Sequence, residues 1–178
     1  MHLVLQPMPQ PADGGICVGL LDDAPCTFHG RVATVGGGEI EAKAIAAEIL
    51  VAVENAARAL FGPEWVQSLA LVSGLNVRTC QRDRIGRYGL PAPVLRALGE
   101  GAAFPWARAL GDVMLATARL AKTVAGDGGR PRKPGEIGLP PVIDTDDQMA
   151  KTVAEAKRVV TWLAQQRAEH RAPAIEDE

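Results

Sequence analysis

Aromatic residues are scarce in this chain of 178 residues, which has three Trp, three Phe and one Tyr. So few aromatic side chains argue against an aromatic-lined ligand pocket and against a large β-sandwich. The sequence also lacks an uninterrupted apolar run of about 18 residues, so no segment is predicted to span a membrane. The stretch from Met1 to Pro7 lacks the positive head and the long apolar run of a secretory signal, and we expect none.

Cysteine is sparse as well, with only Cys17, Cys26 and Cys80. An odd number of cysteines without paired spacing does not indicate a disulfide framework. Such a cysteine content fits a protein of the reducing cytoplasm. Cys17, Cys26 and His29 offer three zinc ligands, but a closed structural zinc site needs four. We therefore predict no metal and no cofactor.

Catalytic patterns are missing too. The chain has three histidines, which are scattered along it: His2, His29 and His170. No Ser/His/Asp arrangement can be built around them. The glutamates of the segment 41–54 are typical of a solvated helix face, because no His-bearing helix accompanies them to make a di-metal site. The sequence therefore predicts a protein that is not an enzyme.

What the chain does have is an uneven distribution of charge. Hydrophobic residues make up 47% and charged residues 22%, which supports a packed core, and the net charge is −2. Residues 1–75 carry three basic side chains against eight acidic ones, whereas residues 76–96 carry five arginines against one acid, Asp83. A short block of arginines in an otherwise acidic chain indicates an anion-binding surface, although most charge runs are merely solvated faces.

The N-terminal part predicts a small sheet followed by a helix. Residues 14–35 show short apolar runs separated by turn residues, typical of a hairpin or a three-stranded meander. Residues 39–60 have an apolar face at helical spacing, with Glu54 and Arg58 as an i,i+4 ion pair. Gly36–Gly38 lacks the Lys-Ser/Thr of a phosphate-binding loop, and we interpret it as a flexible joint between strand and helix.

Residues 59–100 carry the most specific pattern. A helix is predicted from Pro63 to Val72, followed by the turn 73–75 with Gly74 at a position that favours positive φ. Asn76 then caps a second helix over 77–85, which Gly86 ends. Ala70 would allow the second helix to cross closely, and Cys80 is expected as a small buried side chain. This is the pattern of a helix-turn-helix.

The arginine block coincides with the second helix of this pattern. In a helix-turn-helix the second helix enters the major groove, where Arg suits guanine and Asn or Gln suits adenine. Arg84 and Arg87 are expected on phosphates. The predicted DNA-binding residues are Asn76, Arg78, Thr79, Gln81, Arg82, Arg84 and Arg87. The alternative is a purely structural role, in which residues 59–100 are two packed helices that bind no ligand.

Within residues 59–100 the chain resembles bacterial and phage helix-turn-helix proteins of the repressor-like kind. The resemblance rests on five short matches: Gly62-Pro63-Glu64-Trp65, Ser73-Gly74-Leu75, Arg78-Thr79, Gly86 and Leu90-Pro91-Ala92-Pro93-Val94-Leu95. It implies a compact DNA-binding unit with regulatory function. The pattern departs at Asp83, where such proteins carry Trp or another large apolar residue that packs the second helix on the core.

The remaining sequence predicts two further helices. Pro105 opens one whose stripe is Trp106, Leu110, Val113, Thr117, Leu120 and Val124. A Gly/Pro-rich linker follows, and a capping box at Thr145 starts the last helix. Its seam, at Met149, Val153, Ala156, Val160 and Leu163, suits packing within the chain and dimerisation equally well.

These patterns together predict an α+β protein, mostly α, with a small N-terminal β-hairpin or meander packed on a long helix. We expect a β-hairpin and helix unit over 1–58, a helix-turn-helix domain with a following helix over 59–125, a linker over 126–146, a helix over 147–170 and a tail over 171–178. The expected function is transcriptional regulation by a cytoplasmic, nucleoid-associated homodimer on double-stranded DNA, without a membrane partner. A protein partner of the N-terminal unit is left open. The alternative is a non-catalytic phage or prophage assembly or adaptor protein.

Overall fold

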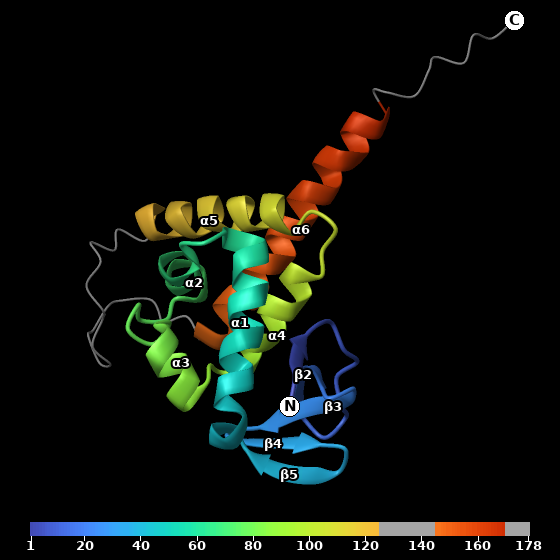
Figure 1. Cartoon of the computed structure of the whole chain (residues 1–178). Coiled ribbons are helices and arrows are strands. Elements are labelled where there is room, and N and C mark those ends of the chain that lie inside the picture. The colour runs from blue at the N-terminus through green and yellow to red at the C-terminus, as the bar shows by residue number, and fades with distance from the viewer. Residues whose placement is uncertain (125–144, 170–178) are drawn as a thin grey trace, which may run out of the picture.

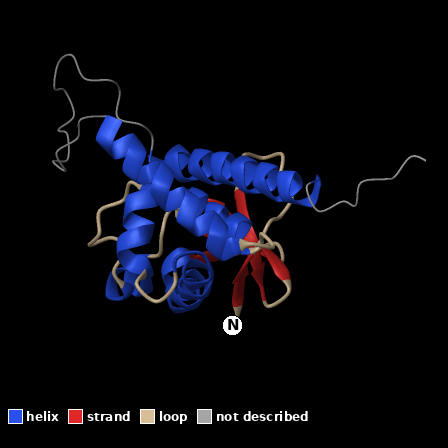
Figure 2. Cartoon of the chain, turned by 90° about the horizontal axis from the view of Figure 1, so that it is seen from above, coloured by secondary structure: helices blue, strands red, loops and turns tan. Residues whose placement is uncertain are grey.

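The computed structural model describes residues 1–124 and 145–169. The fold is α+β, as predicted, with an antiparallel sheet at the N-terminus and helices along the rest of the described chain (Figure 1). Figure 2 shows the helices gathered to one side of the strands. None of the described helices is both long and apolar enough to cross a membrane. The predicted tail and nearly all of the predicted linker lie outside the described residues.

The sheet is a five-stranded meander in chain order. Its strands are β1 (Leu3–Leu5), β2 (Ile16–Leu21), β3 (Ala24–His29), β4 (Val32–Val35) and β5 (Gly38–Glu41). The turn between β2 and β3 has two residues, Asp22 and Asp23, with φ of +47° and +67°. Two-residue turns with positive φ match the twist of paired strands, so they close hairpins tightly. The sequence predicted the middle three strands and missed β1 and β5.

The predicted flexible joint at Gly36–Gly38 is wrong, and the predicted start of the long helix is wrong with it. Gly36 and Gly37 form a two-residue turn in which both φ angles are positive, at +57° and +86°, and this turn pairs Val35 with Gly38. Residues 39–41 therefore belong to β5. A short 3-10 helix, η1 (Ala42–Ile45), comes next, and α1 begins only at Ala46.

The core is built around α1 (Ala46–Phe61), which lies in the centre of the molecule (Figure 1). It packs on α2 (Trp65–Ser73), α3 (Arg82–Tyr88), α4 (Ala92–Ala102), α5 (Ala107–Val124) and β1. Its buried face repeats at helical spacing, with Ile49, Val53 and Leu60 fully buried. One hydrophobic cluster runs from the sheet through the helices. The division into units at residue 58 stays a prediction.

Two glycines allow the helices to approach backbone closely. A Cβ atom on Gly111 of α5 would lie 2.0 Å from the carbonyl oxygen of Leu60 in α1. A Cβ atom on Gly99 of α4 would lie 2.7 Å from the backbone nitrogen of Gln6, next to β1. Such distances leave room for hydrogen only, so these two positions fix how α5 and α4 sit on their neighbours.

The predicted apolar stripe of α5 is partly wrong. Leu110, Met114 and Ala118 face the core, whereas Trp106 and Leu120 are 51% and 64% exposed. The buried face is the one on which Gly111 lies against the Leu60 carbonyl, where α5 packs on α1. In the sequence, both the predicted face and the face that is actually buried are apolar, so spacing alone did not distinguish them.

The apolar seam of the last helix, α6 (Thr145–Glu169), packs against other helices of the same chain. Met149, Val153, Ala156 and Val160 are buried against α2, α4 and α5. Of the two alternatives that the sequence left open, packing within the chain thus holds for these four residues, while Leu163 is 43% exposed. The Gln148 side chain joins this contact by donating to the Val72 carbonyl in α2 at 3.3 Å.

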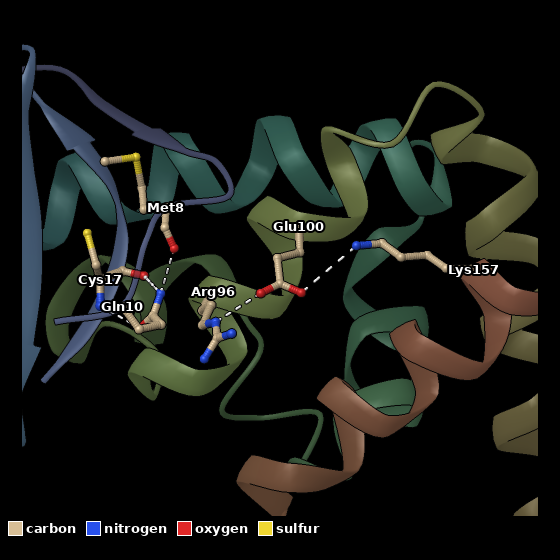
Figure 3. A network of polar contacts seen from close by, with 6 residues as sticks. All are labelled: Met8, Gln10, Cys17, Arg96, Glu100 and Lys157. Atoms are coloured by element: carbon tan, nitrogen blue, oxygen red, sulfur yellow. Dashed lines mark hydrogen bonds and ion pairs between the residues drawn. The ribbon is translucent and has the colours of Figure 1, made fainter. Parts of the chain in front are cut away.

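Polar contacts tie distant segments together, as Figure 3 shows. Glu100 on α4 accepts a hydrogen bond from Arg96 Nε at 2.9 Å and lies 3.9 Å from Lys157 Nζ on α6. The amide of Gln10 donates to the Cys17 carbonyl and accepts from the Cys17 nitrogen, each at 3.1 Å. Gln10 therefore serves as a partner for the Cys17 backbone beyond the point where β1 stops pairing with β2, at Leu5 and Gly19.

All three cysteines are buried and unpaired. Burial, together with a smaller effect of the nearby Cys17, raises the pKa of the Cys26 thiol from 9.0 to about 11. Burial also raises the pKa of the Cys80 thiol to about 11, against the opposing effect of its hydrogen bond with Ser73. The expectation that Cys80 is a small buried side chain is confirmed.

These thiols make stability depend on alkaline pH. An unfolded thiol ionises near pH 9.0, whereas Cys26 and Cys80 stay neutral in the folded protein up to about pH 11. The free energy of unfolding should be at its full value below pH 9 and fall as the pH rises from 9 to 11, by about 2 kcal/mol for each thiol at pH 10.5. Urea unfolding at pH 8.0 and pH 10.5 measures this loss. The variant Cys26→Ala/Cys80→Ala should lose about 4 kcal/mol less between the two pH values, and an equal loss in both proteins would contradict the prediction.

Candidate nucleic-acid interface

The segment between α2 and α3 is a single helical turn on a short loop. Gly74 ends α2 in the left-handed region, at φ +72°. The Thr79 nitrogen donates to the Asn76 carbonyl at 2.8 Å, and the Arg78 nitrogen donates to Asn76 Oδ1, also at 2.8 Å. Cys80 is fully buried and anchors this turn to the core. Asn76, Arg78 and Thr79 are therefore held in place with their side chains exposed.

The second helix begins five residues later than predicted. Gln81 has an extended backbone, with φ −70° and ψ 144°, and it separates the turn from α3 at Arg82–Tyr88. Gly86 lies inside α3 and does not end it. The predicted helix over 77–85 is therefore wrong, and of the predicted contact residues only Arg82, Arg84 and Arg87 lie on a helix.

The partner of α3 also differs from the prediction. α3 packs on α1, and its buried Ile85 and half-buried Gly86 face that helix, with Leu50 Cδ2 3.4 Å from where a Cβ on Gly86 would lie. The prediction that the second helix crosses α2 at Ala70 is therefore wrong, and Ala70 is buried where α2 meets the rest of the core. Asp83, where a large apolar residue was expected, is exposed on the outer face of α3.

Four of the predicted residues line one open hollow of about 330 Å³. Asn76, Arg78 and Thr79 come from the turn and form one wall. Arg84 comes from α3 and forms the other wall with Tyr88, its guanidinium lying 5.5 Å from the centre of the Tyr88 ring. Gly89 completes the lining. The hollow thus has a largely apolar lining, an arginine side chain on each wall and one aromatic ring at its side.

Arg82 is engaged within the protein. Its Nη2 lies 3.2 Å from Glu54 Oε1 on α1, and Glu54 also pairs with Arg58 at 2.6 Å, as predicted for that i,i+4 pair. The Arg82 guanidinium lies 5.6 Å from the ring centre of Trp65, which is fully buried in α2. Arg82 therefore joins α3 to α1 and α2, and its charge is largely compensated.

Arg78, Arg84 and Arg87 have no acidic side chain at ion-pair distance within the described part of the chain. Gln81 and Arg87 are exposed, but they do not line the hollow. Sequence reasoning missed Tyr88 and Gly89. The signal for Tyr88 was its position four residues after Arg84, which places both side chains on one face of a helix.

Metal and catalytic groups do not gather here. Within residues 1–124 and 145–169, no group of three or more His, Cys, Asp or Glu side chains is placed to hold a metal ion. His29, one of the three zinc ligands considered, is exposed on β3 and lies 3.5 Å from Asp13 Oδ2. The chemistry that the hollow offers is therefore binding of an anion by guanidinium groups and stacking on a phenol ring.

Comparison with known proteins adds no relative, because no family model, no curated protein and no solved structure matches this chain.

Proposed function

We propose that the protein binds DNA through a basic surface made of Arg78, Arg84 and Arg87. The observation that carries the proposal is that these three guanidinium groups lie close along the chain, are at least partly exposed and have no acidic partner in the described residues. Other arginines of the chain are engaged in ion pairs: Arg58, Arg82, Arg96, Arg108 and Arg158. Guanidinium groups left without an acidic partner are well suited to phosphate oxygens.

Phosphate contacts account for most of the affinity in this proposal. α3 has seven residues, about 10 Å, and its first residue, Arg82, is held by Glu54. A helix this short, with its first residue held in an ion pair, can present few side chains to base edges. Arginines on the turn and on α3 can instead contact successive phosphates of a DNA backbone. Transcriptional control of bacterial or prophage genes by a homodimer is the use that we propose for this binding.

The test is a fluorescence-anisotropy titration with a mixed-sequence DNA duplex at 50 and 200 mM salt. Three phosphate contacts give a slope of about −2.7 in log affinity against log salt, so the affinity should fall about 40-fold between the two conditions. The variant Arg78→Ala/Arg84→Ala should bind more weakly and lose about two units of this slope.

The matched control is Arg31→Ala/Lys43→Ala, which removes the same charge from exposed positions at the β3–β4 turn and in η1. It should keep the salt dependence of the unmodified protein. Equal losses in both variants would mean that net charge alone sets the affinity. Absence of duplex binding at 50 mM salt would overturn the proposal.

A second candidate is the assembly or adaptor protein. It is favoured by exposed apolar side chains near the end of α6, where Val159, Trp162 and Leu163 are 40%, 57% and 43% exposed. Apolar side chains that cluster on one helix face are typical of protein contacts. Substituting Trp162 and Leu163 by Ala, with light scattering as the readout, should abolish self-association if this face joins two copies. The arginine variant should leave the oligomeric state unchanged.

A further inference from the structure

The hollow beside α3 has the composition of a site for one nucleotide. Its aromatic ring belongs to Tyr88, the only tyrosine of the chain, which is 67% exposed at the end of α3. Aromatic rings are usually buried because each removes a large apolar area from water. Trp106 and Trp162 are exposed as well, but only Tyr88 lies beside arginine side chains that line a hollow, where its ring can stack on a ligand.

We propose that this hollow binds one unpaired nucleotide of single-stranded DNA. The inference rests on the proposed function and names the form of DNA that the basic surface prefers. The phosphate lies between Arg78 on the turn and Arg84 on α3, and the base stacks on Tyr88. Base stacking on an aromatic side chain tolerates every base, because every base has a π-face.

The shape of the hollow favours a single strand over a duplex. In a duplex the faces of the bases are covered by their neighbours, so only an unstacked base can reach a ring such as Tyr88. The hollow measures about 330 Å³, at the lower end of the range for small-molecule sites, so it suits one nucleotide. The stacked base pairs of a duplex would contact only the rim of the hollow.

The polar wall supplies groups for the rest of the nucleotide. Asn76 uses its Oδ1 atom to accept from the Arg78 nitrogen, which leaves its amide NH2 to donate into the hollow. Thr79 is exposed beside it and offers a hydroxyl. Both positions are fixed by the hydrogen bonds of the helical turn, so the wall is formed before a ligand arrives.

Arg84 makes two contacts in this arrangement, one with the Tyr88 ring and one with the phosphate. Its guanidinium lies 5.5 Å from the ring centre of Tyr88, so it holds the ring by a cation–π contact. The same group faces the hollow, where it can pair with a phosphate oxygen. Tyr88 lies in the last turn of a short helix, so this contact limits the directions that the ring can take.

The experiment compares a labelled 12-nucleotide single strand with a duplex of the same sequence, in 50 mM salt, by fluorescence anisotropy. The protein should bind the single strand at least tenfold more tightly than the duplex. Tyr88→Ala should weaken single-strand binding about tenfold and change duplex binding less than twofold. Tyr88→Phe keeps the ring and should restore single-strand binding.

Trp106→Ala is the control for loss of an exposed aromatic side chain, since Trp106 is 51% exposed just before α5 and does not line the hollow. It should bind both DNA forms as the unmodified protein does. Circular dichroism checks that Tyr88→Ala keeps its helices. Binding of the duplex without a preference for the single strand, and without an effect of Tyr88→Ala, would overturn this inference and leave the proposed function standing. No binding of either form would overturn both.

Discussion

Replacing Gly111 by alanine is expected to lower the free energy of unfolding by about 3 kcal/mol. The new Cβ atom would lie 2.0 Å from the carbonyl oxygen of Leu60 and 2.6 Å from its carbonyl carbon. The obstacle is backbone in the last turn of α1, so no side chain can turn aside to make room. α5 would have to move away from α1, which would open gaps around the buried Leu110 and Met114. Urea unfolding followed by circular dichroism measures the change.

The matched control for this substitution is Gly86→Ala in α3. There the added Cβ atom would meet only Leu50 Cδ2, the end of a flexible side chain, at 3.4 Å. Alanine has the higher helix propensity, so this variant should be as stable as the unmodified protein or up to about 1 kcal/mol more stable. Equal destabilisation by both substitutions would show that the contact with Leu60 does not set the position of α5.

Substitution of Trp65 by alanine is expected to cost about 4 kcal/mol. Trp65 is among the largest fully buried side chains of the described chain, and it opens α2 beside α1. Its loss leaves a cavity that the surrounding helices cannot fill. It also removes the ring over which the Arg82 guanidinium lies, which frees one contact of α3 with the core.

Trp65→Phe separates the cavity from the other effects. Nε1 of Trp65 is buried without a hydrogen-bond partner among the described residues, so phenylalanine loses volume but no hydrogen bond. We expect a cost of about 2 kcal/mol. Tryptophan emission provides a second readout, because Trp106 and Trp162 are exposed and the blue-shifted part of the spectrum should come from Trp65. A cost below 1 kcal/mol for Trp65→Ala would contradict the packing described for α2.

Local patterns predicted the elements whose partners lie nearby in the sequence. The strands within residues 14–35, the ion pair of Glu54 with Arg58, and α2 with its end at Gly74 all follow from spacing and turn chemistry. β5 escaped prediction because its residues, Gly38–Glu41, include a single apolar side chain, Ile40, flanked by glutamates that also suit the start of a helix. What places them in the sheet is the turn at Gly36-Gly37, which pairs them with β4.

Long-range packing could not be predicted in the same way. Glycine commonly ends helices, yet Gly86 lies inside α3, where it faces Leu50, 36 residues earlier in the chain. Glu54 and Arg82 pair over a separation of 28 residues. The position of the arginine block was predictable, but which of its members are engaged within the protein depends on such contacts.

The edge strand β5 affects how two molecules of this protein can associate. β1 is covered by α1 and α4, whereas no strand of the described chain pairs with the outer side of β5. An open strand edge can template pairing with another chain. Two of the four residues of β5 are exposed glutamates, Glu39 and Glu41, so two copies brought edge to edge would set carboxylates against each other. At neutral pH this repulsion keeps the sheet from extending from one molecule into the next.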